Sequence, residues 1–167
     1  MGAEERKYLF ENTKLKIGTI LDFGLLYKRL FSWFEVMGYD FHETNYEQHD
    51  AGGGDLLKIF WVSTKTVDDY TKFVIKTNFF ITGFKKVEVE KDGLKMKLHK
   101  CTIEMRMTAY MVYDVGDKMK KSIGVVGRRM YEKFIVKNRM DDHEIQLYME
   151  TGQLWDEIKG FVSMHKF

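Results

Sequence analysis

Residues 70–84 read YTKFVIKTNFFITGF, and this stretch decides the fold. Apolar and polar side chains alternate along it, as they do in a strand whose two faces meet different surroundings. One face carries Thr71, Phe73, Ile75, Thr77, Phe79 and Ile81, and the other carries Tyr70, Lys72, Lys76, Asn78 and Thr82. The alternation predicts a sheet that packs a core on one side and faces water on the other.

The segment after this strand predicts a long β-hairpin. Gly83 permits a bend or a bulge, residues 86–91 alternate as a short strand, and Asp92-Gly93 is a strong hairpin-turn signal. Residues 94–114 then read as one very long strand. Its apolar positions change from even to odd numbers at His99-Lys100, which predicts a β-bulge or a break in that strand.

Before residue 70, the chain predicts one helix and three more strands. Residues 19–37 are apolar on most sides of a helix, with Thr19 as the cap and Gly38 after the last turn. A helix of this kind is usually buried on more than one face, between the sheet and another helix or in an oligomer contact. The three strands are residues 8–17, 39–48 and 56–66.

After residue 114, the chain predicts two helices. Residues 119–138 read as a basic amphipathic helix, although Gly124 and Gly127 weaken its first turns. Residues 141–162 repeat apolar side chains at alternating spacings of four and three. That spacing is typical of a helix that packs on a sheet or on another helix.

These elements predict a single α+β domain over residues 1–167. Its antiparallel sheet has about five to six long strands, with one helix after the first strand and two C-terminal helices. Residues 1–117 would form the helix and sheet, and residues 118–167 a C-terminal helical hairpin. The order of elements is similar to that of the helix-grip ligand-binding domains, and this similarity implies a sheet wrapped around a long helix.

Composition places the chain among globular proteins that need no cross-links. Hydrophobic residues make up 44% of it and aromatic residues 15%, which is enough apolar surface to offset chain entropy. Cys101 is the only cysteine, so an intramolecular disulfide and a cysteine-cluster zinc site are excluded. The first residues are charged, and charges interrupt the apolar stretch at residues 20–37, so neither a signal peptide nor a membrane span is expected. We therefore expect a cytoplasmic protein.

Clusters of chemically active side chains point to no reaction. His42-Glu43 and His49-Asp50 are dense His/carboxylate pairs, but neighbouring residues of a strand point to opposite faces, which disfavours chelation. Residues 51–54, AGGG, precede a strand rather than a helix, so a flexible hairpin loop is favoured over a phosphate loop. Cys101 begins an apolar series and is interpreted as a buried, inert thiol. We expect no catalytic residue, no metal site and no cofactor.

Charge is distributed unevenly along the chain, although the net charge is only +2. Residues 31–57 hold six acids and no lysine or arginine, whereas residues 118–139 hold eight bases and one acid. At helical spacing, four of these bases form a ridge that would contact an anionic partner, namely Arg128, Arg129, Lys133 and Lys137. The hairpin carries a second basic cluster, Lys85, Lys86, Lys91, Lys95, Lys97 and Lys100.

Three functions fit these features. The leading interpretation is a non-enzymatic binding or scaffolding domain that acts through protein contacts, self-association included, since charge runs are usually solvated faces. The first alternative is a nucleic-acid- or ribosome-associated protein that uses the basic helix at residues 118–139. A membrane surface is a less favoured partner for that helix. The second alternative is a carrier of a small apolar ligand, or an enzyme, with a cavity between sheet and helix.

Overall fold

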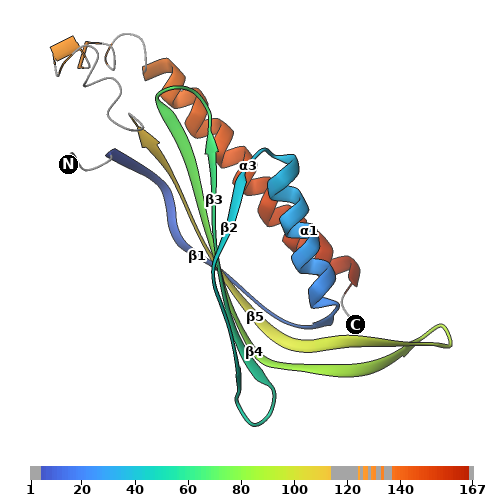
Figure 1. Ribbon diagram of the computed structural model, residues 1–167. Helices are drawn as coiled ribbons and strands as arrows, with labels where there is room; N and C mark the ends of the chain where they lie inside the picture. The colour runs from blue at the N-terminus through green and yellow to red at the C-terminus, as the bar shows by residue number, and fades with distance from the viewer. Residues whose placement is uncertain are drawn as a thin grey trace.

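The computed structural model describes residues 5–113 and 137–165, together with Gly124, Val126, Gly127, Arg129, Met130 and Lys133. Its elements in chain order are β1 (Glu5–Leu21), α1 (Phe23–Val36), β2 (Asp40–Asp50), β3 (Asp55–Thr66), β4 (Thr71–Lys91), β5 (Leu94–Tyr113) and α3 (Lys137–His165). The strands form one five-stranded antiparallel sheet in the order β1-β5-β4-β3-β2 (Figure 1). The predicted α+β class and antiparallel sheet are therefore confirmed.

Both helices cover the same face of the sheet, which we call the inner face (Figure 1). On β5 the odd-numbered residues from Cys101 to Tyr113 belong to the core beneath the helices, whereas Tyr110 and Val112 belong to a separate cluster on the opposite, outer face. Large side chains fill the inner layer. The largest of those that are almost completely buried are Trp61, Phe34, Phe73, Leu21, Leu26, Leu30, Leu57, Ile59, Ile75, Ile81, Met105 and Met107. This packing confirms the predicted core face of residues 70–84.

Helix α1 begins one turn later than predicted. The predicted cap, Thr19, lies in β1 and is buried, and Asp22 caps the helix instead, accepting a hydrogen bond from Leu25 N at 3.0 Å. Strand β1 extends to Leu21, because its pairing with β5 continues past Thr19. Gly38 follows the last turn with φ of +81°, as a residue after a helix end commonly does.

Strands β4 and β5 form a hairpin that extends beyond the helices (Figure 1). The turn is at Asp92 and Gly93, both with positive φ, as predicted. The two strands expected at residues 70–84 and 86–91 are one strand, β4, whose register with β5 shifts between Thr82 and Lys85. Gly83 lies in this β-bulge with φ of +62°.

The predicted bulge or break in β5 at His99-Lys100 is wrong. Both residues stay paired with β1 and with β4, and the extra residue lies in β4 opposite Cys101. The apolar positions change parity because the hairpin turns its apolar side chains to the outer face, where Val87 pairs with Leu98 and Val89 with Met96. The inner face of the hairpin extends past the helices and carries charged residues instead.

One C-terminal helix is described, α3, where two were expected. It begins at Lys137, four residues before the predicted start, and packs into the same core through Leu147, Leu154, Ile158 and Phe161. Most of the predicted helix at residues 119–138 lies outside the described residues, and so does the hairpin it would form with α3. Residues 137 and 138, expected at its end, are instead the first residues of α3.

Candidate functional site

The outer face of the sheet is rich in cations. Neither α1 nor α3 lies on it, so its side chains project away from the core. Strand register and side-chain alternation place ten basic residues there: Arg6, Lys14, Lys16, Lys58, Lys72, Lys76, Lys85, Lys91, Lys100 and Arg106. The same rules place three carboxylates there: Asp40, Glu47 and Glu104. Asp40 and Glu47 are both on the edge strand β2, so the other four strands are strongly basic.

Several of these cations have no carboxylate partner among the described residues. Arg106 pairs with Glu104 at 2.6 Å, and this hydrogen-bonded pair, with Lys14 and Lys16 nearby, holds the pKa of Glu104 below its usual value. Within the part of the chain that the structure describes, Lys14, Lys16, Lys58 and Lys72 form no ion pair. The outer face therefore keeps a positive field above β1, β5, β4 and β3.

Aromatic rings lie among these cations. Tyr8 and Tyr110 are 4.9 Å apart between ring centroids, and Arg6 Cζ lies 5.2 Å from the Tyr110 centroid, with Lys76 Nζ at 5.7 Å. A second group has Phe60 and Phe80 at 5.6 Å, with Arg106 Cζ 4.7 Å above the Phe80 ring. Tyr8 is 43% exposed, and Phe60 and Phe80 are half-buried. Rings and guanidinium planes of this kind offer flat surfaces next to positive charge.

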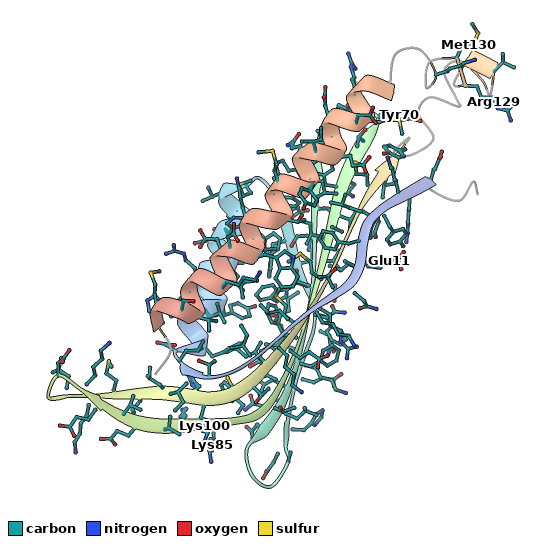
Figure 2. All side chains as sticks on the ribbon, turned by 180° about the vertical axis from the view of Figure 1, so that it is seen from behind. Glu11, Tyr70, Lys85, Lys100, Arg129 and Met130 are labelled. Carbon is teal, nitrogen blue, oxygen red and sulfur yellow. The ribbon has the colours of Figure 1, made fainter. Side chains whose placement is uncertain are left out.

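The predicted basic ridge is only partly described. Arg128 lies outside the described residues, and nothing is described of the Lys137 side chain, although its backbone begins α3. Arg129 and Lys133 are exposed and line a hollow of about 440 Å³ beyond the end of the sheet near Tyr70 (Figure 2). Glu5 and Asp141 also line that hollow, so its charge is mixed.

The lysines of the hairpin do not form one cluster. Lys85 and Lys100 are directly paired on the outer face, whereas Lys86 and Lys97 alternate to the inner face. Lys95, also on the inner face, lies 3.7 Å from Glu88. The predicted second basic cluster is thus divided between the two faces of the sheet.

Among the described residues, the most buried charged residue is Glu150 of α3, at 6% exposure. It accepts hydrogen bonds from Tyr39 Oη at 2.5 Å, from Lys65 Nζ at 2.7 Å and from Gln146 Nε2 at 3.0 Å. Burial, followed by the bond to Glu150, raises the pKa of Tyr39 far above its ordinary value. This network joins α3 to β3 and to the residue that precedes β2.

The acidic strand β2 carries no metal-binding cluster. His42 Nε2 lies 3.2 Å from Asp40 and His49 Nε2 lies 3.5 Å from Glu47, each as an exposed pair on the sheet edge. Glu43 points to the inner face, where it accepts hydrogen bonds from Trp61 Nε1 at 3.1 Å and from Tyr27. In the described ranges, no group of three or more His, Cys, Asp or Glu side chains is placed to hold a metal ion.

Cys101 and the glycine loop have the structural roles that the sequence indicates. The Cys101 thiol is 5% exposed, and burial raises its pKa to about 11, which disfavours the reactive thiolate. Residues 51–54 form the turn between β2 and β3, where Asp50 accepts a hydrogen bond from Gly52 N at 2.8 Å.

The basic outer face was missed in the sequence, although its signal is present. Lys72 and Lys76 occupy the wet positions of β4, and Lys14 and Lys16 alternate in the same way on β1. Only the register shows that these lysines share one face with Arg106 and Lys58.

Three comparisons, with family models, with curated proteins and with solved structures, found no match to the chain. Over the described residues, neither helix combines the length and the apolar character needed to cross a membrane.

Proposed function

We propose that this domain is a non-enzymatic binding module that holds single-stranded nucleic acid across the outer face of its sheet. The observation that carries the proposal is the combination of unpaired lysines with accessible rings on one uncovered face. Lys14, Lys16 and Lys72 offer charge to a phosphate backbone, while Tyr8 and the Phe80–Arg106 pair offer flat surfaces to bases. Proteins that bind single strands combine these two elements.

The geometry favours single strands over duplexes. Stacking on a ring requires an unpaired base whose face is free, and such contacts contribute about 1–3 kcal/mol per base. Tyr8 is on β1 and Phe80 is on β4, and β5 lies between these two β-strands. A bound nucleic acid that contacts both rings would therefore cross the sheet rather than run along one β-strand. Arg106 adds a guanidinium plane between them, which is a further stacking surface for a base.

The test is binding of a labelled mixed-sequence RNA and DNA, measured by fluorescence anisotropy at two salt concentrations. The double variant Lys14→Glu, Lys76→Glu changes the outer face. Its matched control, Lys28→Glu, Lys159→Glu, makes the same change in net charge on exposed positions of α1 and α3. We expect the first variant to bind much more weakly, and the slope of its log affinity against log salt concentration to fall by about one per lysine. The control should keep the affinity and the slope of the native protein. Equal losses in the two variants would show that only net charge matters, and would refute the proposal.

A protein-docking role is the second candidate, and a separate surface supports it. Ile145, Tyr148 and Met149 are exposed on α3, and Ile145 and Tyr148 line a hollow of about 300 Å³ with Leu9 of β1. Exposed apolar clusters of this kind often contact other proteins. A Tyr148→Glu variant that leaves nucleic-acid binding intact but abolishes self-association in sedimentation would support this second role. Unchanged sedimentation would argue against self-association there.

A small-molecule carrier is less well supported. The layer between sheet and helices, where such a ligand would lie, is filled by side chains such as Phe34, Trp61 and Phe73, each at most 1% exposed. A bound apolar ligand would have to displace them.

A further inference from the structure

A hollow of about 480 Å³ lies on the outer face beside the β-bulge. Two short cross-strand rows of residues and one loop residue build it. Gly18, Thr102 and Thr82 pair across β1, β5 and β4, and the next row holds Ile20, Lys100 and Lys85. Gly53, from the turn between β2 and β3, lines its side. Gly18, Gly53 and Gly83 line the hollow and contribute no side chain that would fill it.

Lys85 and Lys100 are the charged groups of this hollow. They are direct partners in the antiparallel ladder and project from neighbouring strands at the bend of the sheet (Figure 2). Like charges directly opposite each other on one face destabilise a sheet. No acidic residue lines the hollow, and in the described ranges neither lysine forms an ion pair. The pair is therefore a local concentration of positive charge that the protein itself does not neutralise.

Two threonine hydroxyls complete the polar lining. Thr82 and Thr102 are paired next to the two lysines, and each hydroxyl can donate one hydrogen bond. Two ammonium groups and two hydroxyls match the charge and the several acceptor oxygens of a dianionic phosphate. A phosphodiester carries only one negative charge, so it matches the two ammonium groups less well than a terminal phosphate, which carries two.

We propose that this hollow binds the phosphate group of a phosphate monoester, with Lys85 and Lys100 pairing with its charge and Thr82 and Thr102 donating hydrogen bonds. The site does not depend on the nucleic-acid function proposed above, because a free phosphate needs neither the rings nor the other lysines of the outer face.

The chain offers a variant that fills the hollow without removing a charge. A Cβ on Gly18 would meet only Thr102 Oγ1, at 3.8 Å, which is ordinary contact, and Gly18 does not have positive φ. Gly18→Val should therefore fold normally, and it should stabilise β1, because glycine weakens the interior of a strand. Gly83 is unsuitable for this purpose, since its φ of +62° would strain any side chain.

The experiment is calorimetric titration of the full chain with inorganic phosphate at constant ionic strength and mildly alkaline pH, where phosphate is dianionic. We expect one saturable site in the native protein. Lys85→Ala and Lys100→Ala should each weaken binding at least tenfold, and Gly18→Val should abolish it without lowering the melting temperature. Lys28→Ala, at an exposed position of α1 outside the hollow, should change the affinity less than twofold.

Two further ligands identify the source of the phosphate. Ribose 5-phosphate represents a small metabolite, and an oligonucleotide with a 5′-phosphate represents a nucleic-acid end, each compared with its form without phosphate. A preference for either phosphorylated form that Gly18→Val removes would support the site. The site is overturned if the native protein shows no saturable phosphate binding, or if Gly18→Val and both lysine variants bind phosphate as the native protein does.

Discussion

Lys65 of β3 and Glu150 of α3 form an ion pair of 2.7 Å in which the lysine side chain is 20% exposed and the glutamate side chain 8% exposed. The same carboxylate accepts the hydroxyl of Tyr39, whose ring lies 5.3 Å from Lys65 Nζ. A buried pair is expensive to break from one side, because the remaining charge has no partner. The position of α3 on the sheet therefore depends on both members.

The first prediction concerns this pair. Lys65→Met leaves Glu150 buried without its cation and should lower the free energy of unfolding by about 3 kcal/mol. Adding Glu150→Gln removes the unpaired charge while keeping an oxygen for Tyr39, so the double variant should be more stable than Lys65→Met alone. Urea unfolding of the two variants checks this, and additive losses would contradict it.

A second prediction concerns alkaline pH. Burial raises the pKa of Cys101 to about 11, and burial with nearby carboxylates raises that of Tyr113 to about 12. The pKa of Tyr39 is raised further, by burial and by its hydrogen bond to Glu150. The unfolded chain loses these protons first, so the stability they contribute is complete below their ordinary pKa values and is lost as pH rises through the folded values. The free energy of unfolding should fall from about pH 9 upward, and less steeply in Tyr39→Phe; an equal slope would argue against a role for Tyr39.

A third prediction uses the contact between the β2–β3 turn and the β-bulge of β4. A Cβ on Gly54, whose φ is +145°, would lie 2.6 Å from the carbonyl carbon of Gly83. Both the clash and the backbone strain should make Gly54→Ala destabilising, by about 1–3 kcal/mol or more. Gly53 is the matched control, because its Cβ would meet nothing within 4 Å. Equal melting temperatures for Gly53→Ala and Gly54→Ala would show that the close approach of Gly54 to Gly83 does not affect stability.

A fourth prediction compares the two faces of β4. Phe73 is 0% exposed on the inner face, whereas Phe80 is half-buried on the outer face. Phe73→Ala should cost about 3–5 kcal/mol, as expected for a large cavity in a core. Phe80→Ala should lower the free energy of unfolding by clearly less than Phe73→Ala does. It should nevertheless weaken nucleic-acid binding, because it removes a stacking surface. Chemical unfolding and anisotropy measure the two effects, and the reverse order of stability losses would be inconsistent with the described faces.

The sequence predicts those parts of the fold that depend on a pattern of neighbouring residues. The alternation in residues 70–84 identifies the inner face of β4, and Asp92-Gly93 identifies the hairpin turn, because both depend on neighbouring residues. The pairing of β1 with β5 and the position of the extra residue opposite Cys101 depend on distant residues, and no local pattern contains them. The outer face was missed for the same reason. Its lysines come from strands far apart in sequence, whereas the ridge at residues 118–139 was visible as one run.

The position of β1 in the sheet also has a consequence for the order of folding. Strands β2 to β5 are joined as consecutive hairpins, so each can pair with a neighbour soon after it is synthesised. Strand β1 comes first in the chain, yet Thr19 pairs with Cys101 of the last strand. Closing so long a loop is entropically costly, and contacts of high sequence separation slow folding. We therefore expect β1 to join the sheet late, which leaves its edge exposed on the nascent chain until β5 has left the ribosome.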